Sequence, residues 1–232
     1  MLMAMVMAAE RAAREIRDNW ANPHSTIAFL SAGKLYDHFS GVLKKKQIES
    51  ILSTFESYSL QKEEHRPGNV FDGFSLPTHI DNILEVDSFQ INEISDSNMG
   101  VAHIFCGLNT FSKRLFAIPL IKRDARSGLE ALKEIFRLSR TLPDFVVSDQ
   151  GGECSAKLIR EYLLSRGVTP IIVTGRHKAA SVERVQRTLQ KRIYTYMNEY
   201  QTTSFIPVLT DLVFSYNSTK HATIKWWVGC VY

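Results

Sequence analysis

The chain has 232 residues, of which 44% are hydrophobic and 22% charged, and its formal net charge is +4. This composition is typical of a globular protein with a sizeable core and excludes a low-complexity or strongly charged disordered chain. The mild positive charge permits a polyanionic partner but does not require one.

Cysteine usage and the start of the chain narrow the class of protein further. The three cysteines, Cys106, Cys154 and Cys230, form no CxxC pair, which argues against a disulfide framework or a zinc knuckle and favours a reducing compartment. The opening run MLMAMVMAAERAAREI is too short to span a bilayer and lacks the basic start of a signal peptide. It is therefore expected to be a helical leader, without a membrane role.

Apolar spacing in the first third of the chain predicts helices. Between residues 34 and 58 the spacing predicts two short amphipathic helices broken near Gly41. The lysine triplet 44–46 between them is interpreted as a solvated face, with DNA contact or a weak nuclear signal as the alternative. Residues 61–80 contain two prolines and two glycines and read as a linker. The expected organisation is a leader (1–27), a helical N-terminal module (28–60), the linker (61–80) and a core (81–232).

After the linker the pattern changes to strands that later alternate with helices. Strands are predicted at 82–91, 101–108, 114–121, 145–149 and 169–174, and helices at 128–140, 155–166, 180–200 and 204–216. The turn sequence DSNMG separates the first two strands, as in a hairpin. Five strands in this order predict an α/β domain: a mixed sheet flanked by helices and preceded by a small helical module.

Three acidic residues are candidates for a shared site. Asp149 ends the strand of VVSDQGGEC; the glycines after it leave room beside it, although Asp and Gly are also common in ordinary turns. Asp87 lies within the first strand, where an acid is costly unless the strand is at an edge and the side chain faces water. Glu183 lies beside the apolar stripe of its helix, where a surface pair with Arg187 is the alternative.

If these carboxylates converge at one end of the sheet, they suit hard divalent cations, which prefer oxygen ligands. Two such ions about 3.5–4 Å apart promote in-line displacement at a phosphodiester. Six basic residues and a single acid between 176 and 192 indicate either a solvated helix face or a track for phosphates. These basic residues are Arg176, Lys178, Arg184, Arg187, Lys191 and Arg192.

Five motifs, in order, resemble the catalytic core of retrovirus-like integrases: VDSF, FSKRLFAIPL, SDQGGEC, KAASVERVQRTLQKRI and YNSTKHATI. The upstream segment beginning KLYDHFSGVLKKKQIES is similar to the helical module of Maverick/Polinton transposon integrases and related retrotransposons. The resemblance covers roughly residues 28–225.

The resemblance implies an RNase H-like fold whose DDE triad, here Asp87, Asp149 and Glu183, holds two Mg²⁺ or Mn²⁺ ions. It implies 3′-end processing of element DNA, followed by strand transfer into target DNA. Such enzymes act as homo-oligomers, and a nuclear location is expected. Basic residues near the glutamate would approach DNA: Lys178, Arg184, Arg187 and Lys191.

The sequence also departs from that family. Asn109 stands where relatives often have Asp, no His-His-Cys-Cys zinc module precedes the core, and the ending WWVGCVY is expected to reflect C-terminal truncation. Two other functions therefore stay open. One is an inactive or domesticated remnant that binds nucleic acid without metal, and the other is an RNase H-like nuclease acting on RNA–DNA hybrids.

Overall fold

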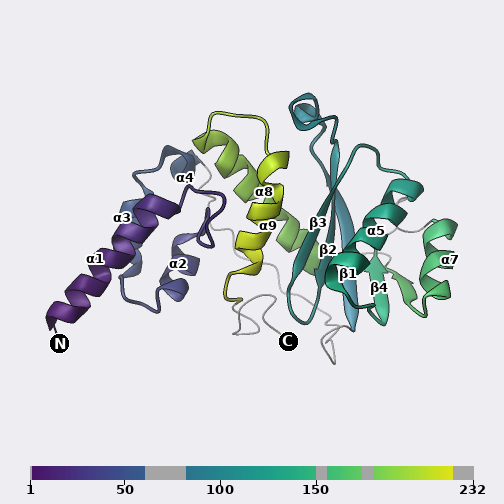
Figure 1. The fold of residues 1–232 in the computed structure, drawn as a ribbon, viewed down its shortest axis with the longest axis horizontal. Helices are drawn as coiled ribbons and strands as arrows, with labels where there is room; N and C mark the ends of the chain where they lie inside the picture. Colours follow the sequence, from purple (N-terminus) through teal and green to yellow (C-terminus); the bar gives the residue numbers. More distant parts are fainter. Residues whose placement is uncertain (1, 61–81, 150–155, 174–179, 222–232) are drawn as a thin grey trace. The chain divides into compact units, whose positions relative to one another are not determined.

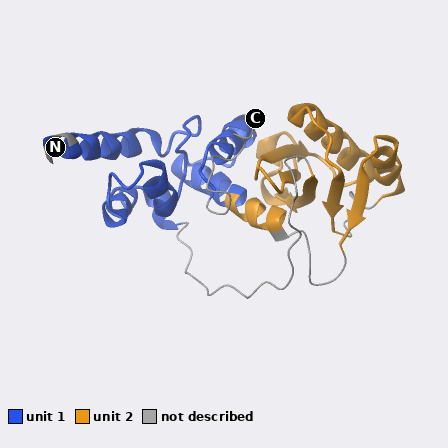
Figure 2. Cartoon of the chain, turned by 90° about the horizontal axis from the view of Figure 1, so that it is seen from below, with its two compact units in different colours: residues 1–67, 189–228 blue, residues 68–188, 229–232 orange. Residues whose placement is uncertain are grey.

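The computed structural model describes residues 2–60, 82–149, 156–173 and 180–221 (Figure 1). The predicted linker at 61–80 lies outside these ranges. The chain divides into two compact units (Figure 2). We call residues 1–67 with 189–228 the N-terminal unit, and residues 68–188 with 229–232 the sheet unit.

The N-terminal unit is helical, as the apolar spacing predicts. Trp20 is 1% exposed, and its indole N–H donates to the carbonyl of Leu30 at 2.8 Å. The rings of Phe29, Phe55 and Tyr58 pack around it, so a single large side chain joins segments distant in sequence. The helices are α1 (Leu2–Asn19), α2 (Ala32–His38), α3 (Lys45–Leu52), α4 (Glu56–Leu60), the 3₁₀ turn η3 (Ile206–Val208) and α9 (Leu209–Asn217).

The predicted break near Gly41 is confirmed. Gly41 has a φ of +73°, the left-handed conformation that favours glycine, and its N–H donates to the carbonyl of Tyr36 after the end of α2. The three lysines that follow are exposed. Their exposure agrees with a solvated face and leaves DNA contact as an untested alternative.

The sheet unit contains a five-stranded mixed sheet in the order β3-β2-β1-β4-β5. β1 pairs antiparallel with β2, and β2 with β3, whereas β4 runs parallel to both β1 and β5. The strands are β1 (Ile83–Gln90), β2 (His103–Asn109), β3 (Leu115–Leu120), β4 (Phe145–Ser148) and β5 (Thr169–Ile172). Asp87 thus lies on the central strand, and the edge-strand alternative is wrong.

Two helices form the core of this unit with the sheet. α5 (Ala125–Ser139) contacts β2 and β3, and α7 (Lys157–Ser165) contacts α5 and β5 (Figure 1). Their apolar side chains pack with Leu84 and Val86 of β1 in one cluster. A Cβ on Gly107 would lie 2.8 Å from the Cδ1 of Ile135, so glycine is what allows α5 to approach β2 this closely.

The remaining elements agree with the expected fold class. The turn between β1 and β2 contains two 3₁₀ turns, η1 (Asn92–Ile94) and η2 (Asp96–Asn98), and ends with Met99 and Gly100 at positive φ. The long helix α8 (Ala180–Glu199) follows β5. The prediction of an α/β fold with a mixed five-stranded sheet flanked by helices is confirmed. In the described residues, every helix falls short of the length and apolar character needed to cross a membrane.

Candidate active site

The central strand β1 presents two acids on one face of the sheet. Side chains alternate along a strand, so Glu85 and Asp87 share a face, while Leu84 and Val86 point into the core beneath α5. Both acids are half-buried. The Asp87 carboxylate accepts a hydrogen bond from the backbone N–H of Ser88 at 2.8 Å.

Asp149 is brought alongside Asp87 by the pairing of parallel strands. Ser148, the last residue of β4, pairs with Val86, so the next position in this register places Asp149 beside Asp87. The N–H of Val173 donates to the carbonyl of Ser148 at 2.8 Å, which holds this end of β4 from its other side. The following residues, 150–155, lie outside the described part, and with them the glycine pair singled out in the sequence.

Glu183 is positioned by the start of α8. The Glu85 carboxylate accepts hydrogen bonds from the backbone N–H groups of Ser181 and Val182 at 3.1 and 3.0 Å. These are donors that a helix leaves unsatisfied at its N-terminus, and a negative charge is favourable there. Glu183 lies in this same first turn. The helix start that carries Glu183 is therefore tied to the face of β1 that carries Asp87.

A basic side chain completes the surroundings of Glu85. Lys113, in the turn between β2 and β3, has its pKa lowered by burial, an effect that the charge of Glu85 opposes and that of Arg184 reinforces. Neither Glu85 nor Lys113 is among the residues predicted from the sequence. The alternation in ILEVDSF could have revealed Glu85, since it stands two residues before Asp87, whereas the position of Lys113 depends on the fold of its turn.

The surface-pair alternative for Glu183 is present in the structure. A guanidinium nitrogen of Arg187 lies 3.9 Å from a carboxylate oxygen of Glu183, whose side chain is 34% exposed. A long contact between such side chains holds them only weakly. Glu183 is therefore paired, yet its carboxylate stays accessible from solvent.

The chemistry of these carboxylates fits a hard divalent cation, and the register places two of them side by side. In the described ranges, no group of three His, Cys, Asp or Glu side chains stands close enough to hold a metal ion. The structure thus gathers the elements that carry Asp87, Asp149 and Glu183 without closing them into a three-ligand cluster. Their assignment as metal ligands stays a prediction.

Cys106 lies beside Asp87 on the same face. The two residues are paired across β1 and β2, and Cys106 is fully buried. Burial, together with the negative charge of Asp87, raises the pKa of the Cys106 thiol well above its usual range. This cysteine is therefore a small buried packing residue rather than a reactive thiol.

Asn109 has a local structural role. Its side-chain oxygen accepts hydrogen bonds from the N–H groups of Phe111 and Ser112 at 3.0 and 2.9 Å. This is the usual way in which Asn fixes a turn. The departure from Asp at this position therefore leaves the carboxylate arrangement untouched.

The basic residues expected to follow DNA divide into two groups. Arg184 and Arg187 are exposed and Lys191 is half-exposed, whereas Arg176 and Lys178 lie outside the described residues. Their contact with DNA stays a prediction.

Arg192 does not belong to an exposed track, and that part of the prediction is wrong. Arg192 is 4% exposed and donates to the hydroxyl of Ser215 at 3.0 Å and the carbonyl of Leu212 at 3.4 Å. Burial lowers its pKa to about 10. It falls three residues after Leu189, on the buried side of α8, and anchors this helix to α9 within the N-terminal unit.

Parts of the chain are similar to known proteins. No protein-family model matches the chain. A transposon-derived protein of Caenorhabditis elegans is 29% identical over 127 residues, covering 55% of this chain and 44% of that protein. The Gag-Pol polyprotein of walleye dermal sarcoma virus is 31% identical over 118 residues, covering 49% of this chain and 7% of the polyprotein. The chain thus spans less than half the length of either relative.

The fold is also found among solved structures. A chain in the cryo-EM structure of a simian T-cell lymphotropic virus intasome, in complex with PP2A regulatory subunit B56 gamma, superposes with a TM-score of 0.58 at 13% identity. The match covers 82% of this chain and 63% of that chain. The homologues are therefore a transposon-derived protein and a retroviral polyprotein, and the chain has the RNase H-like fold of a retroviral integrase core.

Proposed function

We propose that this chain is an integrase-type polynucleotidyl transferase of a mobile element, acting on element ends and target DNA. One observation carries the proposal: Glu85 ties the first turn of α8 to the strand face that bears Asp87. Asp149 follows on the neighbouring strand, so three acids from distant parts of the sequence belong to one region of the sheet unit. The transposon-derived relative and the fold shared with a chain of an intasome are what favour DNA over an RNA–DNA hybrid as substrate.

In this proposal Asp87, Asp149 and Glu183 would hold two Mg²⁺ or Mn²⁺ ions, which when bound promote attack on a phosphodiester. Arg184 and Arg187 are exposed near Glu183 and can neutralise DNA phosphates. Lys178 and Lys191 are proposed to extend this contact. Homo-oligomerisation and a nuclear location belong to the same proposal, and the Maverick/Polinton subtype rests on the helical segment that precedes the core.

The sharpest test uses a branched DNA of arbitrary sequence, because the ends of the element are unknown. The 3′-hydroxyl of a nicked strand attacks the phosphodiester at the branch and forms a new P–O bond. The bond to the branch strand breaks, and the released strand leaves with a protonated 3′-oxygen. We expect joining with Mg²⁺ or Mn²⁺, and no product from Asp87→Asn, Asp149→Asn or Glu183→Gln.

Two matched controls make the same chemical change elsewhere. Asp96→Asn and Glu161→Gln neutralise exposed acids on the turn after β1 and on α7, and should leave joining unchanged. Full activity of the Asp149→Asn protein would refute the assignment of the site.

A non-enzymatic nucleic-acid-binding remnant is the second candidate. It is favoured by the absence of a three-ligand metal group from the described residues and by the pairing of Glu183 with Arg187. This candidate predicts DNA binding that is sensitive to salt but does not depend on divalent metal, with no joined product under any condition. Metal-dependent joining that Glu183→Gln abolishes would exclude it.

A further inference from the structure

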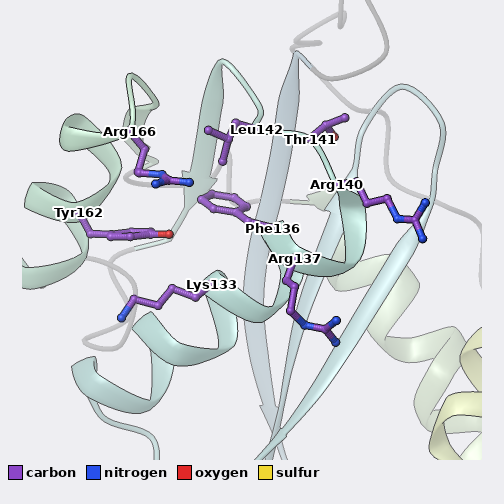
Figure 3. Close-up of a pocket in the computed structure, with 8 residues that line it drawn as sticks. All are labelled: Lys133, Phe136, Arg137, Arg140, Thr141, Leu142, Tyr162 and Arg166. Carbon is purple, nitrogen blue, oxygen red and sulfur yellow. The ribbon is translucent and has the colours of Figure 1, made fainter.

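A pocket of about 340 Å³ lies between α5 and α7, away from the candidate active site (Figure 3). Its Phe136 and Tyr162 pack with the apolar cluster that includes Leu84 and Val86, on the sheet face opposite Glu85 and Asp87. The residues that line it come from the second half of α5, the segment leading into β4, and α7. They are Lys133, Phe136, Arg137, Arg140, Thr141, Leu142, Tyr162 and Arg166.

The pocket is also at the opposite end of the sheet from the carboxylates. Thr141 and Leu142 precede the start of β4, whereas Asp149 follows its end. A ligand bound here would therefore be distinct from a DNA strand at Asp87 and Asp149.

The lining carries four positive charges and no acid. Lys133 and Arg137 are each paired with a neighbour on α5, Glu130 at 2.8 Å and Glu134 at 2.6 Å. Arg140 and Arg166 are exposed, and neither forms an ion pair within the ranges that the structure covers. Arg166 thus brings uncompensated charge beside Tyr162, whereas the guanidinium of Arg140 points away from the rings, where it can meet a neighbouring phosphate of the same strand (Figure 3). Guanidinium is well shaped to bind phosphate.

Aromatic rings form its floor. Phe136 and Tyr162 lie nearly parallel, with ring centroids 6.3 Å apart and an interplanar angle of 21°. The ammonium of Lys133 lies 5.6 Å from the centre of the Tyr162 ring. Figure 3 shows the Tyr162 ring between Lys133 on one side and Arg166 on the other. Arg166 is exposed, and when its side chain swings aside that face of the ring becomes a surface on which a planar base can stack.

We propose that this pocket binds single-stranded nucleic acid, with a base stacked at Tyr162 and phosphates held by Arg140 and Arg166. The volume is at the lower end of the range for small-ligand pockets, roughly 300–1,000 Å³. That size suits one splayed nucleotide, whereas the bases of a duplex are stacked and paired and cannot reach an aromatic floor. An acidic peptide would satisfy the arginines but would leave the paired rings without a planar partner.

The test measures fluorescence anisotropy of labelled oligothymidylate, 20 nucleotides long, with the full chain in EDTA. Because no reaction is involved, the outcome is independent of the proposed catalysis. We expect Arg140→Ala/Arg166→Ala to reduce the slope of log affinity against log salt by about 1.4, which corresponds to two lost phosphate contacts. Arg126→Ala/Arg160→Ala removes the same charge from exposed positions on the same helices outside the pocket, and should leave the slope unchanged.

The aromatic part of the proposal has its own pair of variants. Tyr162→Leu should weaken binding on the order of tenfold, whereas Tyr162→Phe keeps the ring and should retain affinity. Arg184→Ala/Arg187→Ala, on α8, should weaken binding of duplex DNA. In that background, Tyr162→Leu should still bind oligothymidylate more weakly than Tyr162→Phe. Thermal unfolding of each variant shows whether it is folded. If Tyr162→Leu is unfolded, the test rests on the Arg140→Ala/Arg166→Ala protein, whose substituted residues are exposed.

Three outcomes would overturn the proposal. One is equal salt slopes for the pocket and control arginine pairs. Another is equal affinity of the Leu and Phe variants at position 162. The third is competition by polyglutamate as effective as that by unlabelled oligothymidylate, which would assign the pocket to an acidic protein segment.

Discussion

Removal of the Glu85 carboxylate should loosen the start of α8 and impair the candidate active site with it. The carboxylate accepts two hydrogen bonds, from the N–H groups of Ser181 and Val182, at the N-terminus of a 20-residue helix. Loss of an N-terminal cap costs about 0.5–2 kcal/mol, and the interaction of a charge with the helix dipole adds about 0.3–1 kcal/mol. We therefore expect Glu85→Ala to destabilise the helix start by about 2 kcal/mol. Glu85→Gln, which keeps an acceptor, should cost about half as much.

Amide hydrogen exchange measures this effect at the residues concerned. A local loss of about 2 kcal/mol should speed exchange at Ser181 and Val182 by roughly 30-fold in Glu85→Ala, because 1.4 kcal/mol corresponds to a factor of ten. Joining of branched DNA should fall in parallel, since Glu183 lies in the same helical turn. Glu161→Ala, which removes an exposed acid paired with Lys157 at 3.6 Å, should change neither quantity. Unchanged protection in Glu85→Ala would refute the idea that this carboxylate anchors α8.

Three further predictions concern packing and ionisation. Gly107→Ala should destabilise the sheet unit by about 1–3 kcal/mol in urea unfolding, because the new Cβ would lie 2.8 Å from the Cδ1 of Ile135. The second substitution Ile135→Val deletes that Cδ1 atom and should recover part of the lost stability. Since Cys106 is buried and the pKa of its thiol is raised, a protein with its other two cysteines replaced by serine should resist thiol reagents at pH 8 until it is unfolded; fast labelling of the native protein would contradict this. Burial raises the pKa of Tyr216 to about 12, so the folded state keeps a proton that the unfolded chain loses near pH 10. Stability should therefore fall between these values in the wild type. The fall should be smaller in the matching Tyr216→Phe protein, in which Tyr58 and Tyr200, whose pKa values burial also raises, still contribute.

The central strand β1 could be predicted because buried and less buried residues alternate along most of it. In ILEVDSF the apolar and polar residues alternate, and the structure places Leu84 and Val86 in the core and Asp87 on the other face. The order of strands and helices was sufficient for the fold class. What sequence could not supply was the hydrogen bond from the start of α8 to Glu85, because it joins residues 96 and 97 positions apart.

Arg192 shows a different limit. Its charge suggested an exposed phosphate contact, yet it follows Leu189 by three residues and precedes Tyr196 by four, which places it on the apolar stripe of α8. Helical spacing alone would have predicted its burial. Spacing could not reveal the partners of the buried guanidinium of Arg192. It donates to the Ser215 hydroxyl and the Leu212 carbonyl, and it lies 5.7 Å from the centre of the Tyr216 ring.

The register between β1 and β4 also bears on how such a sequence can change over time. Backbone N–H and C=O groups set this register, and nearly every residue type carries both. Substitutions along the strands can therefore accumulate while Asp87 and Asp149 stay neighbours. A fold shared at 13% identity, as with the viral chain, is compatible with this. An insertion or deletion of one residue is a different event, because it would turn Asp87 towards the core. Selection on this site should therefore tolerate many replacements in β1 but hardly any change in its length.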